Sequence, residues 1–148
     1  MKAMLFHIGR ERYALPLASI EQVLPAARLT ALPGAPHYVP GLLELRGEPV
    51  PVIDLSRLAG SPPDAVRYDT RILLVEIEVL GRRRRLGLKA ERVTGVAELP
   101  EPFTGAGVAA APWLGGIANL EPGMVQLLDP GRLLAPEVER LLFGEAAP

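Results

Sequence analysis

The two halves of this 148-residue sequence resemble each other, and this internal repeat restricts the fold more than any other feature. When Gly41–Leu58 is shifted by 75 residues onto Gly116–Leu133, the residue types Gly, Leu, Val, Asp, Arg and Leu coincide. A shift of 73 residues aligns two further apolar pairs upstream, Ile20 with Val93 and Val23 with Val96. The repeat predicts a single domain over residues 1–148 that contains two similar β units, at about 4–60 and 71–134.

Short apolar runs separated by turn residues predict an all-β fold. The expected strands are Met4–Ile8, Tyr13–Leu17, Gly41–Leu45, Val50–Leu55, Arg71–Leu80, Arg85–Ala90, Gly115–Leu120 and Met124–Leu128. Four short connections between them are typical of antiparallel hairpins: Gly9–Arg12, Arg46–Pro49, Gly81–Arg84 and Glu121–Gly123. Helical pattern is limited to short turns at Leu17–Leu24, Leu55–Gly60 and Gly131–Leu134 and to a C-terminal helix at Pro136–Phe143.

The residue inventory argues against catalysis and against a metal or cofactor. There are no cysteines, and the two histidines, His7 and His37, lie far apart, so neither a nitrogen–sulfur metal site nor a thiolate nucleophile is expected. Sixteen basic residues balance 17 acidic ones, which disfavours nucleic-acid binding. The N-terminal segment lacks the apolar core of a signal peptide and no run is long enough to span a bilayer, so a cytoplasmic protein without membrane insertion is expected.

Four features have both a structural and a functional interpretation. Asp54 and Asp129 recur at matching repeat positions, where each can cap the turn that follows its strand; a catalytic carboxylate pair is the other interpretation. The run Arg82–Arg85 suits a solvated hairpin tip or a clamp for an acidic partner. Trp113 is interpreted as a core residue in preference to a partner-binding anchor.

Two stretches carry a resemblance to a known family. The order F-x-I-G-x-E-x-Y-A-L-P-L-x-x-I-x-x-V begins at Phe6, and LPGAPHYVPGLLELRGEPVPVIDL follows at Leu32–Leu55. Together they resemble the CheW-like domain, and looser agreement continues to about Leu134. The chain departs from the usual family residues at Gln22, Glu44 and Lys89–Ala90, which indicates a divergent member.

The resemblance implies a fold and a function. The implied fold is two SH3-like five-stranded β-barrels with a groove between them, a few short helices and a C-terminal helix. The implied function is that of a non-catalytic scaffold, monomeric when free, that couples the cytoplasmic tip of a methyl-accepting chemoreceptor to a CheA-type histidine kinase. By the same resemblance, the receptor-binding residues are Arg46, Ile20, Gly41, Gly47, Val23 and Leu24.

Arg46 matches the family's motif arginine and either orients a partner or pairs internally, with Glu21 and Glu44 as the candidate internal partners. Turn geometry or close backbone approach is the structural explanation for Gly41 and Gly47. Two other functions remain open at this point: a small-ligand-binding β-barrel, and a module that binds an acidic partner or nucleic acid through the basic tip at Arg82–Arg85.

Overall fold

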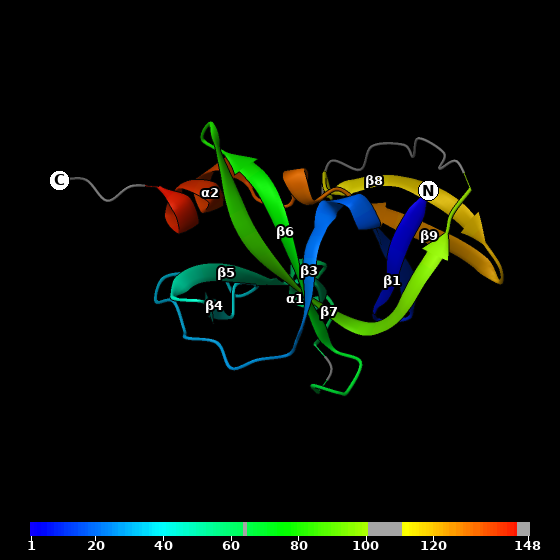
Figure 1. The fold of residues 1–148 in the computed structure, drawn as a ribbon, viewed down its shortest axis with the longest axis horizontal. Coiled ribbons are helices and arrows are strands. Elements are labelled where there is room, and N and C mark those ends of the chain that lie inside the picture. The colour runs from blue at the N-terminus through cyan, green and yellow to red at the C-terminus, as the bar shows by residue number, and fades with distance from the viewer. Residues whose placement is uncertain (64, 101–110, 145–148) are drawn as a thin grey trace.

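The computed structural model describes residues 1–63, 65–100 and 111–144, and nine strands account for most of them (Figure 1). Each of the eight expected strands is present. The strands are β1 (Lys2–Ile8), β2 (Glu11–Pro16), β3 (Ile20–Pro25), β4 (Gly41–Leu45), β5 (Glu48–Asp54), β6 (Arg71–Val79), β7 (Arg82–Glu98), β8 (Leu114–Leu120) and β9 (Gly123–Leu128). The helical elements are η1 (Leu17–Ser19), α1 (Leu55–Leu58), η2 (Pro130–Arg132) and α2 (Pro136–Phe143).

All four predicted hairpins form. The pairs β1–β2, β4–β5, β6–β7 and β8–β9 are antiparallel and are joined by two-residue turns. The β6–β7 turn is Leu80–Gly81, so Arg82–Arg84 of the expected connection belong to β7 instead. Two of the turns place both central residues at positive φ, Arg46 and Gly47 between β4 and β5, and Leu80 and Gly81 between β6 and β7. Such a turn matches the twist of the strands that it joins.

Strand pairing builds two five-stranded sheets that share β7. The first sheet has the order β4-β5-β7-β6-β3, and the second has the order β7-β1-β2-β9-β8. Residues 82–90 of β7 belong to the first sheet and residues 91–98 to the second, so this strand runs from one sheet into the other (Figure 1). Within the described residues strand ladders close neither sheet, but Thr30 exchanges two backbone hydrogen bonds with Leu42 of β4.

The sheets divide the chain differently from the segments 4–60 and 71–134. The hairpin β1–β2 pairs with the end of β7 and with β9, whereas β3, the strand that follows it in the chain, pairs with β6. The hairpin β6–β7 in turn joins β3 and β5. Each sheet therefore combines a hairpin from one half of the chain with three strands from the other half.

The two sheets are equivalent in register as well as in order. Gly87 lies between Leu74 and Val52 in the first sheet, and Ala14 lies between Leu5 and Leu127 in the second. A Cβ atom on Gly87 would lie 3.0 Å from Cγ2 of Ile72 and 3.1 Å from Cγ2 of Val52. This close packing explains why the first sheet has glycine where the second sheet has alanine. The sequence repeat thus reflects equivalent strand positions.

Three apolar clusters make up the core. The largest lies between the sheets and contains buried residues of both, among them Phe6, Leu15, Ile53, Leu73 and Leu128. Each sheet also curls around a smaller cluster, built on Leu43, Val50, Val52, Ile72 and Leu74 in the first sheet and on Ala3, Ala14, Leu99, Ala118, Val125 and Leu127 in the second. Trp113 belongs to the central cluster as predicted: it is 7% exposed, and its ring lies 6.4 Å from that of Tyr13.

Two expectations about local structure were wrong. The segment Leu17–Leu24 forms one short 3-10 turn followed by β3, since pairing with β6 outweighs its helix-like spacing of apolar residues. The strand expected at Arg85–Ala90 extends to Glu98, because its second part finds β1 as a new partner. The C-terminal helix has the predicted bounds, and the few short helices and two curled five-stranded sheets confirm the expected fold class.

Candidate functional site

The residues expected to bind a partner lie on two separate segments of the first sheet. Ile20, Val23 and Leu24 are on β3, while Gly41, Arg46 and Gly47 are on β4 and in the turn that follows it. These strands form opposite ends of the sheet order, with β5, β7 and β6 between them. Their relative position therefore depends on how the sheet curls and on what connects its two ends.

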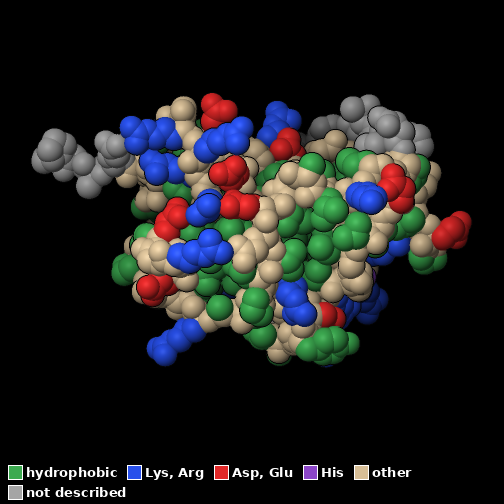
Figure 2. Space-filling model, in the orientation of Figure 1, with side chains coloured by type: hydrophobic (Ala, Val, Ile, Leu, Met, Phe, Trp, Pro, Cys, Tyr) green, Lys and Arg blue, Asp and Glu red, His purple; other side chains and the backbone are tan. Residues whose placement is uncertain are grey.

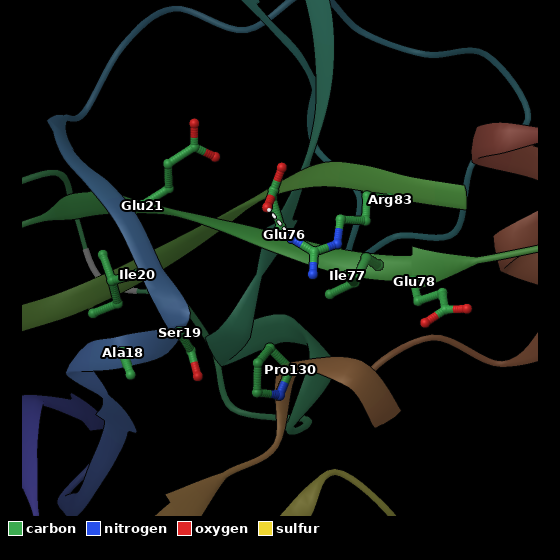
Figure 3. Close-up of a pocket in the computed structure, with 9 residues that line it drawn as sticks. All are labelled: Ala18, Ser19, Ile20, Glu21, Glu76, Ile77, Glu78, Arg83 and Pro130. Carbon is green, nitrogen blue, oxygen red and sulfur yellow. Dashed lines mark hydrogen bonds and ion pairs between the residues drawn. The ribbon is translucent and has the colours of Figure 1, made fainter. Parts of the chain in front are cut away.

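Ile20 lines a surface hollow of about 490 Å³ where elements of the two sheets meet (Figure 3). The Ile20 side chain is half-buried and packs against the central cluster, as does the buried Ile77 on β6. The full lining comes from η1, β3, β6, β7 and η2: Ala18, Ser19, Ile20, Glu21, Glu76, Ile77, Glu78, Arg83 and Pro130. The hollow thus offers apolar surface beside charged groups.

Three carboxylates line this hollow, and arginines pair with two of them. Glu76 pairs with Arg83, whose Nη1 lies 3.5 Å from its Oε2, and Glu21 pairs with Arg85. The Glu78 side chain is exposed, and it makes no hydrogen bond or ion pair with the part of the chain that the structure describes. An apolar side chain flanked by a cation fits such a surface, since opposite charges at an interface favour and orient binding.

A pair of equivalent valines is exposed, one on each sheet. Val23 on β3 is 40% exposed and Val96 on β7 is 51% exposed, and they face Leu73 and Met4 in matching registers of the two sheets. Figure 2 shows hydrophobic side chains gathered in the middle of one face of the molecule, between β3 and the end of β7. Val96 was not among the expected site residues, although the 73-residue shift that aligns it with Val23 was the signal for it.

Leu24 lies on the inside of the first sheet and not on its outer surface. It packs with Leu29 and Leu45 against the cluster around Leu43. Successive residues of a strand face opposite sides, so Val23 and Leu24 cannot share a surface. Leu24 therefore contributes to packing.

Arg46 occupies the tip of the β4–β5 hairpin, beyond the last strand pair, Leu45 with Glu48. It is exposed, and no described residue gives it a hydrogen bond or an ion pair. Glu44 makes no such contact either, and Glu21 binds Arg85 instead. The structure thus shows neither of the two candidate internal partners in contact with the Arg46 side chain.

Glycine is required at positions 41 and 47 for different structural reasons. A Cβ atom on Gly41 would lie 2.3 Å from the carbonyl oxygen of Thr30, so only glycine permits the close approach of these two segments. Gly47 has a φ of +82°, and no atom lies within 4 Å of the place that a Cβ would take. The requirement for glycine at position 47 is therefore the turn conformation alone.

The repeated aspartates act as caps, as their sequence context predicted. Asp54 is 2% exposed, and its Oδ1 accepts hydrogen bonds from the backbone N–H groups of Ser56 (3.1 Å) and Arg57 (3.3 Å). Asp129 Oδ1 accepts one from the N–H of Gly131 at 3.1 Å. Both carboxylates are thus used to begin the helical turns that follow their strands.

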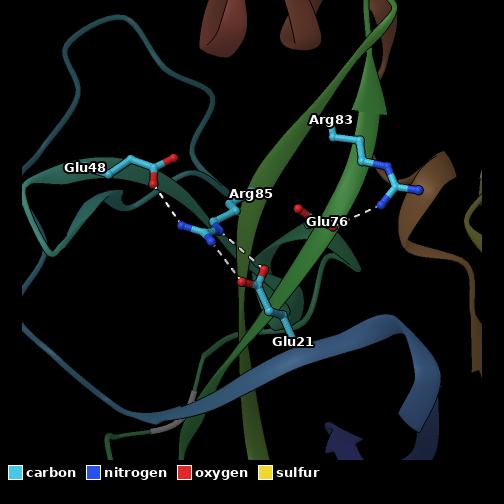
Figure 4. Close-up of polar contacts among 5 residues, drawn as sticks. All are labelled: Glu21, Glu48, Glu76, Arg83 and Arg85. Atoms are coloured by element: carbon cyan, nitrogen blue, oxygen red, sulfur yellow. Dashed lines mark hydrogen bonds and ion pairs between the residues drawn. The ribbon is translucent and has the colours of Figure 1, made fainter.

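The arginine run is less available than a solvated tip would be. Arg83 pairs with Glu76, and Arg85 pairs with Glu21 and with Glu48 (Figure 4). Arg85 Nη2 lies 3.0 Å from Oε1 of Glu21, and its Nη1 lies 2.9 Å from Oε2 of Glu48. These contacts raise the pKa of Arg85, with the hydrogen bond to Glu21 as the main cause. The sequence did not predict that Arg85 pairs with Glu21 and Glu48. The 73-residue shift, which also aligns Arg85 with Arg12, was a signal that this arginine differs from its neighbours in the run.

Two properties bear on the class of protein. Among the described residues, no cluster of three or more His, Asp or Glu side chains is arranged to hold a metal ion. None of the helices in that part of the chain is long and apolar enough to cross a bilayer.

Three proteins of known name align with most of this chain. The chain is 30% identical over 141 residues to the protein FrzA of Myxococcus xanthus, an alignment that covers 91% of this chain and 86% of FrzA. It is 28% identical over 122 residues to the protein PilI of Pseudomonas aeruginosa (78% of this chain, 66% of PilI). It is 26% identical over 100 residues to the chemotaxis protein CheW of Thermotoga maritima (68% and 63%). The last two alignments thus span just under two thirds of those relatives.

A solved structure and a family model cover almost the whole chain. The crystal structure of the scaffolding protein TtCheW from Thermoanaerobacter tengcongensis superposes with a TM-score of 0.81 at 26% identity, covering 97% of this chain and 90% of TtCheW. The model of the CheW-like domain matches residues 2–137. This chain therefore belongs to the family of CheW-like domains.

Proposed function

We propose that this protein is a non-catalytic cytoplasmic adaptor that couples methyl-accepting chemoreceptors to a CheA-type histidine kinase in a chemotaxis-like signalling system. The observation that carries the proposal is the family match over residues 2–137, together with the fold shared with a scaffolding protein. An adaptor acts through its surfaces, so its function depends on exposed apolar anchors and oriented charges.

In this proposal the receptor tip contacts the outer surface of the first sheet. Ile20 and Val23 supply apolar surface, and the unpaired, exposed Arg46 supplies a charge that a partner can bind without first breaking an ion pair to any described residue. Gly41 and Gly47 act indirectly, by permitting the approach to Thr30 and the turn that presents Arg46. The exposed Glu78 carboxylate at the hollow favours a partner with a cation beside an apolar residue.

Neither alternative function gains support from the geometry. A ligand-binding barrel needs a cavity inside a sheet, and apolar side chains such as Val50, Val52, Val125 and Leu127 fill both interiors. A basic-tip module needs available arginines, and Arg83 and Arg85 already pair with glutamates.

Reconstitution tests the proposal. The purified chain is mixed with membranes that contain a methyl-accepting receptor of the same organism and with its CheA-type kinase. We expect the chain to sediment with the membranes, to bring the kinase with it, and to make kinase autophosphorylation depend on receptor ligand. Absence of binding to both partners contradicts the proposal.

A further inference from the structure

Arg85 connects two strands that share no backbone hydrogen bonds. Its guanidinium grips Glu21 of β3 through two nitrogens, Nε to Oε2 at 3.3 Å and Nη2 to Oε1 at 3.0 Å, and reaches Glu48 of β5 through Nη1 at 2.9 Å (Figure 4). In the first sheet β3 and β5 are separated by β6 and β7. One side chain on β7 therefore links both.

The neighbouring ion pair makes no comparable connection. Arg83 and Glu76 lie on β7 and β6, which already pair along the whole of β6, from Arg71 with Ala90 to Val79 with Arg82. By contrast, Glu21 is adjacent to Ile20, and Glu48 is adjacent to the turn that contains Arg46. The contacts of Arg85 thus join the two segments of the proposed receptor-binding surface.

The second sheet has the same topology without this link. Arg12 is the equivalent of Arg85, since it faces His7 on β1 as Arg85 faces Glu76 on β6. Arg12 donates hydrogen bonds to the carbonyl oxygens of Leu120 and Glu121 at the β8–β9 tip. Thr94 stands where Glu21 stands in the first sheet, so that position of β7 offers Arg12 no carboxylate. Of the two equivalent arginines, only the one in the sheet with the proposed site makes the double link.

The exposure of the three side chains predicts where the effect will be measured. Arg85 and Glu21 are each 36% exposed and Glu48 is 52% exposed, and ion pairs of this kind add little to global stability. A two-nitrogen contact between arginine and a carboxylate nevertheless fixes orientation strongly. Loss of the link should therefore change the placement of the two segments more than it changes the melting temperature.

We propose that Arg85 is a positioning residue for the receptor-binding surface, holding β3 and the β4–β5 hairpin in one fixed relative placement. This inference rests on the proposed function, because it assigns Arg85 a role in the same receptor-binding site. A partner that contacts both segments then meets a surface that is already ordered, and less binding free energy is lost in ordering it.

The test compares Arg85→Gln with Arg12→Gln, the equivalent change in the other sheet. Affinity for receptor-containing membranes is measured by co-sedimentation, and the fold is monitored by melting temperature and by backbone amide NMR spectra. We expect Arg85→Gln to weaken receptor binding by about 3- to 30-fold, the range typical of residues that couple neighbouring segments. Its free-state spectrum should change at residues 20–22 and 46–48, whereas Arg12→Gln should leave both those signals and receptor affinity unchanged.

Carboxylate variants distinguish positioning from direct contact. Glu21→Gln and Glu48→Gln should each reproduce part of the loss, and neither should add its full effect to Arg85→Gln. If both bind like the wild type while Arg85→Gln binds weakly, Arg85 touches the receptor itself and the positioning role is overturned. Wild-type affinity in Arg85→Gln also overturns it, but leaves the proposed function intact. Failure of the wild-type chain to bind receptor membranes at all contradicts the proposed function instead.

Discussion

Arg12 and Arg85 stand at equivalent positions in the two sheets, and each guanidinium holds the tip of a hairpin from its own sheet. Arg12 binds backbone carbonyls of the β8–β9 tip, and Arg85 binds Glu48 at the β4–β5 tip. Only Arg85 continues to β3, through Glu21. Two sheets of the same topology thus each bring this arginine to a hairpin tip, and they differ where a partner surface is proposed.

Substitutions at Arg46 distinguish the turn conformation, which affects the fold, from the positive charge, which affects receptor binding. Asparagine adopts positive φ readily and suits a turn before glycine, so Arg46→Asn should keep the melting temperature within about 2 °C of the wild type. The lost charge should weaken receptor co-sedimentation by about tenfold, the scale of an interface anchor, and Arg46→Glu should abolish it. Arg10→Asn, in the exposed turn between β1 and β2, is the matched control and should bind normally. Normal binding by Arg46→Glu excludes Arg46 from the site.

Gly41→Ala should destabilise the fold strongly. The new methyl group would meet the Thr30 carbonyl oxygen at 2.3 Å, so the segment around Thr30 must move or its two hydrogen bonds to Leu42 must break. We expect a loss of about 3 kcal/mol in the free energy of unfolding, measured by urea denaturation. Gly47→Asn, in a turn with open space around the glycine, should cost less than about 1 kcal/mol. Equal losses for the two variants contradict this explanation.

The two capping aspartates should differ in their contribution to stability. Asp54→Ala removes two backbone hydrogen bonds at a site that is 2% exposed and leaves Lys89, 4.0 Å away, without this carboxylate. Asp129→Ala removes one hydrogen bond at a partly exposed site. Urea denaturation should show a loss of about 2 kcal/mol for the first and about 1 kcal/mol or less for the second. The reverse order is the contrary result.

Exchange of hairpins between the halves predicts that neither half folds alone. A chain divided between residues 63 and 64 gives fragments 1–63 and 64–148, and each sheet needs strands from both. Separately, the fragments should lack dispersed amide signals in NMR spectra. Mixed at equal concentration, they should regain the spectrum of the intact chain and bind each other. Native-like dispersion in either fragment alone contradicts the exchanged topology.

The Glu98 carboxylate should titrate below the usual range. The ammonium group of Met1 lies 2.8 Å from Glu98 Oε1, and this hydrogen bond and charge lower the pKa of Glu98. Because the folded pKa lies below the unfolded value of about 4.3, the stabilisation is complete above that value and is lost as pH falls through the folded pKa. Carboxyl NMR titration measures it. Acetylation of the terminal amine should raise the pKa of Glu98 towards normal, and an unchanged pKa rules out the ammonium as its cause.

Local sequence chemistry determined the parts of the fold that depend on neighbouring residues. The four hairpin turns, the caps at Asp54 and Asp129 and the helix that begins at Pro136 follow from residue types within a few positions of each other. The pattern of Leu17–Leu24 misled because its spacing suits a helix equally well, and only the pairing of β3 with β6 makes it a strand. Proposed contact residues were found through family motifs, but their surroundings were not.

Tertiary structure alone decided which hairpin joins which sheet. The two halves have equivalent strands, so β1–β2 matches the pattern of either sheet, and the choice depends on contacts between residues far apart in the chain. The same holds for Arg85, which the sequence places in a basic run and which the fold brings to Glu21, 64 positions away. The repeat and the family motif are patterns of residue types, so they could be recognised in the sequence. The partners of Arg85, Leu24 and Val96 depend on how the two sheets curl around their shared strand, which only the tertiary structure shows.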